Sequence, residues 1–246
     1  MIRSLTALLI AVLFLIVTIP YQLVMWLLRK KWPYLGANID YRLVQWILRV
    51  IKLPLGIKLE VRGRERIPKE GPVLYIGNHR SYLDVVLIIP YLPRMTGFIA
   101  KDELLRFPLL PLWMKNLHCE FIAKDDIKQN LKVILSAIET VKGGNSIFIY
   151  PEGTRNRAED ERDLMEFHEG SFKIATKTGC PIVPVSVNNT RERLETQFPK
   201  ARPGHVIIEF GEPIYTDQLT RQELKGIGAK TRETVRQMVC ENHERL

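Results

Sequence analysis

Residues 72–84 read PVLYIGNHRSYLD, a short apolar run followed at once by polar side chains. The run PVLYIG predicts a buried strand, because it is apolar and bounded by turn-forming residues. A second apolar stretch follows the polar residues and predicts a helix near Leu83–Tyr91. A strand, a polar loop and a helix form the repeating unit of α/β domains, so this stretch indicates that fold class.

The same alternation continues from Pro54 to the end of the chain. We expect seven strands: IKLEV (57–61), PVLYIG (72–77), TGFIA (96–100), CEFIA (119–123), SIFIY (146–150), PIVPVSV (181–187) and HVIIEF (205–210). We expect further helices near 108–116, 127–141 and 171–178 and from 221 to the C-terminus, with KGGN after Val141 as a helix stop. The predicted fold is a central mixed, largely parallel sheet flanked by helices, with an N-terminal membrane-associated helical segment.

The net charge of +9 lies entirely at the front of the 246-residue chain. Residues 1–69 hold 12 basic and 3 acidic side chains, whereas residues 70–246 hold 24 of each. A nucleic-acid-binding protein would carry its basic stripe on the folded domain. Because the basic excess lies elsewhere, we do not expect nucleic acid as a partner. Three cysteines, Cys119, Cys180 and Cys240, are far apart and lack a CxxC pair, which indicates neither disulfides nor a metal site.

The front also carries 24 uncharged residues, Leu5–Leu28, followed by Arg29, Lys30 and Lys31. Fifteen of the 24 are Leu, Ile, Val or Phe, which favours membrane insertion by at most about 5 to 9 kcal/mol. A cleavable signal peptide would have a shorter apolar core and a small-residue cleavage site. Because Pro20 is expected to break the helix, the segment either spans the membrane or dips into it. If it spans, the basic cluster predicts that the rest of the chain lies on the cytoplasmic side of the cell membrane.

Residues 41–53, YRLVQWILRVIKL, predict a basic amphipathic helix with one polar stripe (Arg42, Gln45, Arg49 and Lys52). A helix of this kind with an interfacial tryptophan is suited to an anionic lipid surface, and the alternative is packing on its own domain. We therefore assign residues 1–53 to membrane anchoring and 54–246 to the α/β domain.

Three polar clusters each follow a predicted strand: NHRSYLD follows PVLYIG, KDELLRFP follows TGFIA, and PEGTRNR follows SIFIY. In open α/β sheets ligands bind at the carboxyl ends of the strands, so these clusters are expected to converge on one cleft. The charged loop after the third cluster, RNRAEDERDLMEF (155–167), is long enough to suggest a flap over that cleft.

Two features of these clusters indicate a function: a possible general base and a possible phosphate-binding group. Asp84 can hold one ring nitrogen of His79 and leave the other as a general base for a hydroxyl or water, although an Asp in a first helical turn is also common as a cap. Gly153 permits close backbone approach, Glu152 can orient neighbouring donors, and Arg155 offers a planar fork for a phosphate, worth roughly 1.5 to 3 kcal/mol per hydrogen bond. Lys101 adds a second positive charge, and the alternative for both basic side chains is solvation.

Four blocks, NHRSYLD, GFIAKDELLRFP, YPEGTRNR and CPIVPVSV, together resemble the motifs of the glycerolipid acyltransferases, in order and over about 110 residues. With the apolar N-terminus, the chain resembles the bacterial lysophosphatidic acid acyltransferases of that family. The resemblance implies acyl transfer from acyl-CoA or acyl carrier protein, as co-substrate, to the 2-hydroxyl of lysophosphatidic acid, giving phosphatidic acid. It implies no other cofactor and no metal, and membrane lipids as partners.

By this resemblance His79 is the general base and Asp84 its orienter, without an acyl-enzyme. The same resemblance assigns the acceptor phosphate to four residues (Lys101, Glu152, Gly153 and Arg155). It also implies that Asn78 holds the histidine or polarises the thioester, and that Pro184 shapes the site wall. The rival functions are a hydrolase with Ser81 as nucleophile, which lacks the GxSxG elbow, a non-catalytic membrane-binding protein, and an acyltransferase for another lysophospholipid.

Overall fold

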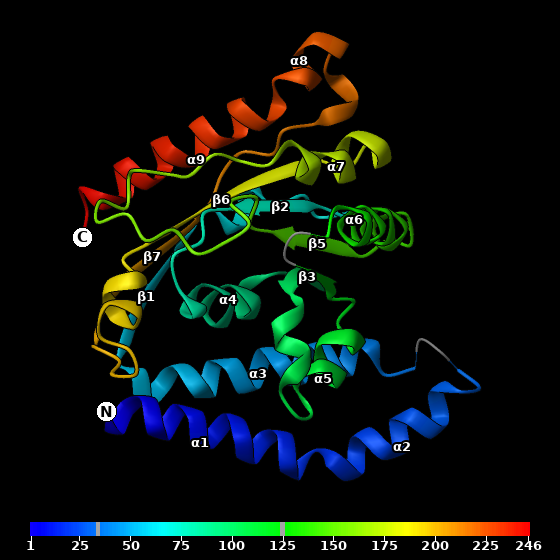
Figure 1. The fold of residues 1–246 in the computed structure, drawn as a ribbon, viewed down its shortest axis with the longest axis vertical. Coiled ribbons are helices and arrows are strands. Elements are labelled where there is room, and N and C mark those ends of the chain that lie inside the picture. Colours follow the sequence, from blue (N-terminus) through cyan, green and yellow to red (C-terminus); the bar gives the residue numbers. More distant parts are fainter. Residues whose placement is uncertain (33–34, 124–125) are drawn as a thin grey trace.

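The computed structural model describes residues 1–32, 35–123 and 126–246 and contains a seven-stranded sheet flanked by helices (Figure 1). The strands are Ile57–Arg62 (β1), Leu74–Gly77 (β2), Thr96–Lys101 (β3), Glu120–Ile122 (β4), Ser146–Ile149 (β5), Ile182–Asn188 (β6) and Gly204–Phe210 (β7). Their order is β1-β7-β6-β2-β5-β3-β4, and every neighbouring pair is parallel except β6 and β7. The seven predicted strands and the mixed, largely parallel sheet are confirmed.

The central strands are buried on both faces of the sheet. Every residue of β2, β5 and β6 is buried, which explains why their sequences are continuous apolar runs. Successive side chains point to opposite faces, so Leu74 and Ile76 join one core cluster and Tyr75 joins the other. Two hydrophobic cores, one on each face, therefore hold the sheet rigid beneath its loops.

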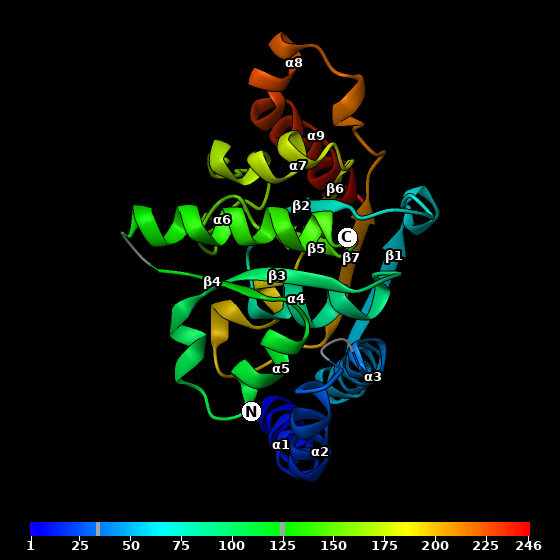
Figure 2. The same ribbon diagram turned by 90° about the vertical axis from the view of Figure 1, so that its right-hand side faces the viewer.

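Helices cover both faces (Figures 1 and 2). One face carries Tyr82–Ile88 (α4), which continues into a 3-10 turn Ile89–Tyr91, and Leu110–Asn116 (α5); the other carries Ile127–Lys142 (α6), Lys173–Thr178 (α7) and Ile227–His243 (α9). The predicted helices are confirmed with shifted ends. The C-terminal one is interrupted at Gly226, so that Arg221–Lys225 (α8) precedes α9. α6 ends at Lys142 before Gly143, as KGGN predicts.

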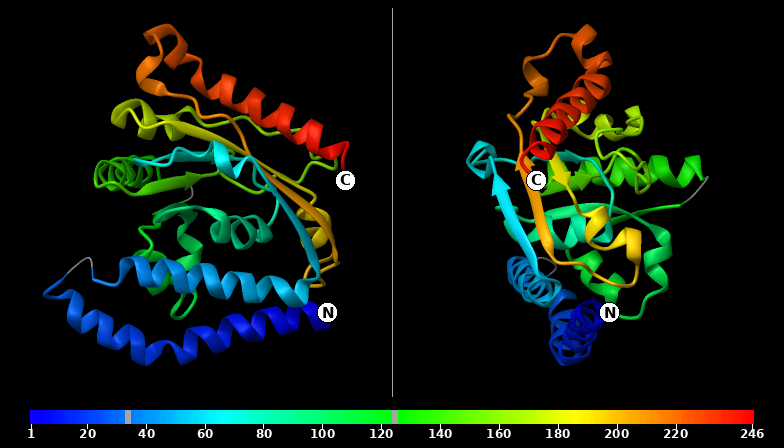
Figure 3. Two further views of the ribbon diagram at one scale, coloured as in Figure 1. Left: turned by 180° about the vertical axis from the view of Figure 1, so that it is seen from behind. Right: turned by 90° about the vertical axis from the view of Figure 1, so that its left-hand side faces the viewer.

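The apolar front forms two helices, Ile2–Val17 (α1) and Ile19–Arg29 (α2), with a bend of 46° between them. Pro20 lies in the first turn of α2, where its missing N–H is tolerated but where it cannot continue α1, so the predicted break is confirmed. Within the described ranges no single helix is long and apolar enough to cross a bilayer, whereas the bent pair together has the length and composition to do so. Seen from behind, α1 and α2 lie along one side of the molecule and α8 and α9 along the opposite side (Figure 3).

The amphipathic segment forms Ala37–Leu55 (α3), which lies between α1 and the α/β domain (Figure 1). Two residues of its polar stripe contact the domain instead of lying on lipid: Gln45 donates to the carbonyls of Ile89 and Leu92 at 3.0 and 2.9 Å, and Arg49 donates to that of Pro90 at 2.6 Å. Tyr41 and Leu55 of α3 are buried in the domain core. This face of α3 therefore packs on the chain's own domain, as the alternative interpretation stated.

Candidate active site

The sheet order brings the polar clusters together. β2, β5 and β3 are neighbours and run parallel, so the loops that follow them leave the same edge of the sheet. β6 flanks β2 on its other side and sends residues 189–198 to that edge as well. The predicted convergence is confirmed, with a fourth contributor that the sequence analysis omitted.

His79 and Asp84 form a hydrogen-bonded pair. The Nδ1 atom of His79 lies 2.8 Å from Oδ2 of Asp84, whose side chain is fully buried, while the His79 side chain keeps 18% of its surface exposed. A buried carboxylate acceptor favours the tautomer with the proton on Nδ1 and leaves Nε2 free to accept a proton. The ring stacks on Tyr150 with centroids 4.1 Å apart, which fixes its plane.

Asp84 also caps α4. Ser81 is the N-cap, its hydroxyl accepts from the backbone N–H of Leu83 at 3.1 Å, and Oδ2 of Asp84 accepts from the N–H groups of Arg80 and Ser81 at 2.8 and 2.9 Å. The cap and the hydrogen bond to His79 are therefore compatible, because Oδ2 of Asp84 takes part in both. Because the Ser81 hydroxyl is buried and used in the cap, it is not presented as a nucleophile.

Glu152 holds the backbone around the histidine. Its two carboxylate oxygens accept from the N–H groups of His79 and Met165 at 2.8 and 3.2 Å, and its side chain is buried. Burial raises the pKa of Glu152, opposed by these two hydrogen bonds. This placement corrects the expectation that Glu152 binds phosphate: both oxygens are occupied, and a buried carboxylate would repel an anion.

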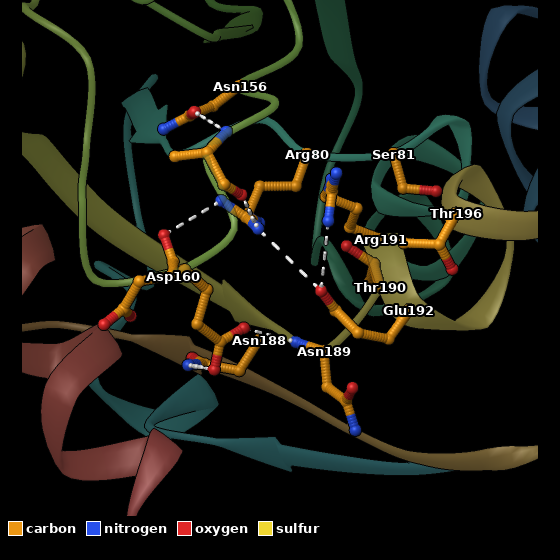
Figure 4. A network of polar contacts seen from close by, with 12 residues as sticks. Arg80, Ser81, Asn156, Asp160, Asn188, Asn189, Thr190, Arg191, Glu192 and Thr196 are labelled. Carbon is orange, nitrogen blue, oxygen red and sulfur yellow. Dashed lines mark hydrogen bonds and ion pairs between the residues drawn. The ribbon is translucent and has the colours of Figure 1, made fainter.

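The charged loop 155–167 is fastened to the site by Arg80 (Figure 4). The guanidinium of Arg80 is 1% exposed and donates to the carbonyls of Ala158 and Asp160 at 2.7 and 3.4 Å, with Glu192 at 3.8 Å. Burial lowers the pKa of Arg80. The backbone N–H of Asn156 in turn donates to the carbonyl of His79 at 2.7 Å. The loop is thus tied to the catalytic segment by buried contacts and does not hang over it as a free flap.

A basic pocket of about 450 Å³ adjoins this segment, lined by Arg80, Tyr82, Arg155, Asn156, Arg157, Arg191, Glu195 and Phe198. Arg155 donates to Glu195 at 3.1 Å, and its guanidinium lies 3.8 Å from the centre of the Tyr82 ring. Glu195 also accepts from the backbone N–H of Tyr82 at 2.8 Å. These contacts hold Arg155 in one orientation, with N–H groups left for an anion.

Lys101 and Gly153 lie beside this arrangement. The Nζ of Lys101, at the end of β3, is 3.3 Å from the hydroxyl of Thr154, so the second cluster does reach the EGTR loop. Gly153 has φ +68°, a conformation that glycine adopts without strain. Neither residue is among those that line the basic pocket.

Asn78 and Pro184 both lie at the pairing of β2 with β6. The side-chain amide of Asn78 is fully buried and pairs with Val187 of β6 in both directions, each hydrogen bond 2.9 Å long, so it extends the β2–β6 pairing and cannot polarise a thioester. Pro184 lies within β6 opposite Ile76 of β2 and does not line the basic pocket.

Sequence reasoning missed the contributors that follow β6. The hydroxyl of Thr190 donates to Oδ1 of Asp84 at 2.6 Å, Glu195 holds Arg155, and Arg191 lines the pocket. A signal was present, because NNTRERLE follows the strand PIVPVSV as the other polar clusters follow theirs. Among the residues that the structure describes, no group of three His, Cys, Asp or Glu side chains could hold a metal ion.

Fold and site together place a hydrogen-bonded histidine–aspartate pair beside an arginine-lined pocket at one edge of an α/β sheet. The chain belongs to the acyltransferase family, whose model matches residues 58–188.

Named relatives and a solved structure agree with this assignment. A 1-acyl-sn-glycerol-3-phosphate acyltransferase from Borreliella burgdorferi is 38% identical over 135 residues, 55% of this chain and 53% of the relative. One from Saccharomyces cerevisiae is 29% identical over 185 residues, 75% of this chain and 60% of the relative. The chain thus matches little more than half the length of these relatives. The crystal structure of the 1-acyl-sn-glycerophosphate (LPA) acyltransferase PlsC from Thermotoga maritima superposes with a TM-score of 0.82 at 25% identity, covering 98% of this chain and 95% of that one.

Proposed function

We propose that the chain is a 1-acyl-sn-glycerol-3-phosphate O-acyltransferase, which transfers an acyl chain from a thioester to the sn-2 hydroxyl of lysophosphatidic acid and forms phosphatidic acid. The observation that carries the proposal is the His79–Asp84 pair, at 2.8 Å, next to a pocket with several arginines. The names of the relatives support the choice of acceptor.

His79 acts as the general base in the proposed reaction. Its Nε2 takes the proton of the acceptor hydroxyl as the oxygen attacks the thioester carbonyl, and Asp84 stabilises the imidazolium that forms. When the tetrahedral intermediate collapses, the C–S bond breaks, the new C–O ester bond remains, and the proton on Nε2 passes to the leaving thiolate. No acyl-enzyme is needed, because acceptor and donor meet in one site.

Arg155 binds the acceptor phosphate in this scheme. Glu195 and the Tyr82 ring fix its guanidinium, so less entropy is lost when a phosphate binds. Arg157 and Arg191 of the same pocket add positive charge, and Lys101 adds more from the side of Thr154. Fixing the phosphate places the sn-2 hydroxyl against His79, which is the proximity contribution to catalysis.

The apolar N-terminal helices α1 and α2 would bring this site to the membrane that holds the lysophosphatidic acid. The exposed apolar residues of α1 and α2 and the basic Arg29–Lys31 that follow suit a membrane surface, with the α/β domain on the cytoplasmic side. The acyl donor is acyl-CoA or acyl carrier protein, and no other cofactor enters the reaction.

A His79→Ala chain in detergent tests the chemistry. We expect loss of phosphatidic acid formation by at least about a hundredfold, since general-base catalysis contributes about 10² to 10⁴, while sedimentation with vesicles is unchanged. His205→Ala, the same change at a histidine that pairs with Glu60, is the matched control. Undiminished turnover in His79→Ala would refute the assignment.

An acceptor panel separates the remaining functions. The proposal requires lysophosphatidic acid to outperform lyso-lipids with choline, ethanolamine or glycerol headgroups, because a phosphate monoester carries more negative charge than their phosphodiesters and the pocket presents several arginines. Preference for another headgroup identifies a different lysophospholipid acyltransferase. Release of free fatty acid without phosphatidic acid identifies a hydrolase.

A further inference from the structure

Glu195 is the acidic member of an otherwise basic pocket. Of the eight residues that line this pocket in the described part of the chain, four are arginines and one is a glutamate. The Glu195 side chain keeps 17% of its surface exposed and comes from the segment that follows β6. If the pocket binds a phosphate as proposed, a carboxylate in it opposes binding, because like charges repel. The presence of Glu195 there therefore needs a chemical reason.

Two hydrogen bonds fix the Glu195 carboxylate in place. Oε1 accepts from the backbone N–H of Tyr82 at 2.8 Å, and Oε2 accepts from the guanidinium of Arg155 at 3.1 Å. Because both oxygens are held, the carboxylate does not turn away when a ligand enters. A carboxylate can accept about four hydrogen bonds, and within the described residues Glu195 accepts these two, so each oxygen keeps a lone pair for a further donor.

The acceptor phosphate would bind next to this carboxylate. Arg155 pairs with Glu195 through Nη1 and has further N–H donors in the same plane, so phosphate oxygens on those donors lie close to Glu195. Two anions that share one cation repel each other unless a proton lies between them, as two carboxylates in one site do. A phosphate monoester can keep that proton, because its second ionisation lies at roughly pH 6 even without a neighbouring carboxylate. The P–OH group then donates to Glu195 in a charge-assisted hydrogen bond, while the other phosphate oxygens accept from Arg155.

We infer that Glu195 determines the acceptor specificity of the site by accepting a hydrogen bond from the P–OH group of a phosphate monoester. The inference rests on the proposed function, because it concerns the acceptor of that reaction. A sulfate ester has the same tetrahedral shape and three terminal oxygens but carries no proton near neutral pH, and a phosphodiester has no P–OH group. Both place an anionic oxygen against the Glu195 carboxylate, so the pocket selects the phosphate monoester over either.

The first test compares two acceptors with the full chain in detergent, using whichever of palmitoyl-CoA and palmitoyl-acyl carrier protein the parent accepts as donor. The acceptors are 1-oleoyl-sn-glycerol 3-phosphate and its sulfate isostere, 1-oleoyl-sn-glycerol 3-sulfate. The parent should acylate the phosphate ester with a kcat/KM at least about a hundredfold higher. Sites that hydrogen-bond a substrate O–H reject an analogue without it by about 10⁴ to 10⁵, and the partial exposure of Glu195 reduces this effect.

Glu195→Gln gives the second test. Its amide oxygen can accept from the Tyr82 N–H, and its NH₂ group donates to an anion where the carboxylate repelled one. We expect kcat/KM for the sulfate ester to rise by about tenfold or more, because a contact between like charges is removed, and kcat/KM for the phosphate ester to fall. A carboxylate that only orients Arg155 would lower both values alike when it is replaced, so the absolute gain on sulfate separates the two roles.

Glu233→Gln is the matched control, the same change at a glutamate of α9 that pairs with Arg236 and does not line the pocket. It should leave kcat/KM for both acceptors within about twofold of the parent values. Glu195→Ala removes the carboxylate without placing an NH₂ group beside Arg155 and should show the same gain on the sulfate ester. This variant keeps the test decisive if thermal unfolding shows that Glu195→Gln is not folded.

Three results would overturn the inference and leave the proposed function standing. They are equal kcat/KM for the phosphate and sulfate esters in the parent, a preference for phosphate that both Glu195 variants retain, and a fall of both values in the variants with no gain on sulfate. A parent chain that acylates 1-oleoyl-sn-glycerol 3-phosphate from neither donor refutes the proposed function itself.

Discussion

At the scale of single residues, the carboxylate of Asp84 accepts hydrogen bonds from four donors. Oδ2 accepts from His79 and from two backbone N–H groups, and Oδ1 accepts from the hydroxyl of Thr190. Since both oxygens are engaged, the carboxylate cannot rotate, and the imidazole that it holds keeps its orientation. Thr190 is therefore a positioning residue that acts through Asp84.

Thr190→Val removes this donor with little change of shape. Hydrogen bonds to charged groups are worth about 1.5 to 3 kcal/mol, so kcat should fall roughly 10- to 100-fold. KM for lysophosphatidic acid should not change, because Thr190 does not line the basic pocket. Thr190→Ser keeps the hydroxyl and should restore most of kcat, whereas a merely structural role would move both kinetic constants or neither.

Glu152→Gln tests the carboxylate that holds the His79 backbone. Gln offers one oxygen and an NH₂ group where two N–H donors must be satisfied, so one donor is left unpaired. The free energy of unfolding should fall by about 1 to 3 kcal/mol near pH 8, measured by urea denaturation.

The difference in unfolding free energy between the parent and Glu152→Gln should depend on pH, with a definite sign. Burial raises the folded-state pKa of Glu152 above its ordinary value near 4.5, so the folded parent binds this proton more tightly than the unfolded chain does. The parent therefore gains stability relative to Glu152→Gln as pH falls through the raised pKa toward 4.5. If the difference in unfolding free energy between the parent and Glu152→Gln became smaller as the pH falls, the raised pKa of Glu152 would be contradicted.

At the scale of elements, most of the architecture could be predicted because burial patterns are local. β2, β5 and β6 are buried on both faces, and continuous apolar runs mark such strands without knowledge of their neighbours. The convergence of loops follows from strand direction alone. His79 and Asp84 were found because both lie in one strand–loop–helix unit.

The rest depended on the lateral order of the strands, which no local pattern contains. Asn78 pairs with Val187, and Thr190 reaches Asp84, only because β6 lies next to β2. The polar stripe of α3 was equally ambiguous, since spacing shows that side chains share a face but not what that face meets.

The docking of α3 gives a prediction for that element. Gln45→Ala/Arg49→Ala removes three hydrogen bonds to the carbonyls that follow α4. Amide hydrogen exchange in α3 should accelerate by about tenfold or more, since each neutral bond contributes about 0.5 to 1.5 kcal/mol and charged ones more. Arg42→Ala is the matched control, from the same stripe but exposed and without such a bond among the described residues. Equal exchange in both variants would show that apolar packing alone holds α3.

At the scale of the whole molecule, α3 joins α1 and α2 to the α/β domain. On one side the buried Asp40 of α3 pairs with Arg29 and accepts from the hydroxyl of Tyr21, both on α2. On the other side α3 packs beneath α4 (Figure 1), the helix that begins at the catalytic loop. With α1 and α2 docked on lipid as proposed, their depth in that surface would set the height of His79 above it.

Two deletions separate anchoring from folding. Removing residues 2–29 takes away α1 and α2; the remaining chain should fold, lose sedimentation with vesicles and keep most of its activity on a short-chain, soluble lysophosphatidate. Removing residues 2–53 also takes away Tyr41 and Ile47, which are 4% and 6% exposed. Burial of a large apolar side chain contributes about 1.5 to 3 kcal/mol, and these two with the half-buried Val44, Leu48 and Ile51 amount to most of the roughly 5 to 15 kcal/mol by which a domain is stable. The longer deletion should therefore give no cooperative thermal transition, and a folded, active product would instead place the domain boundary after α3.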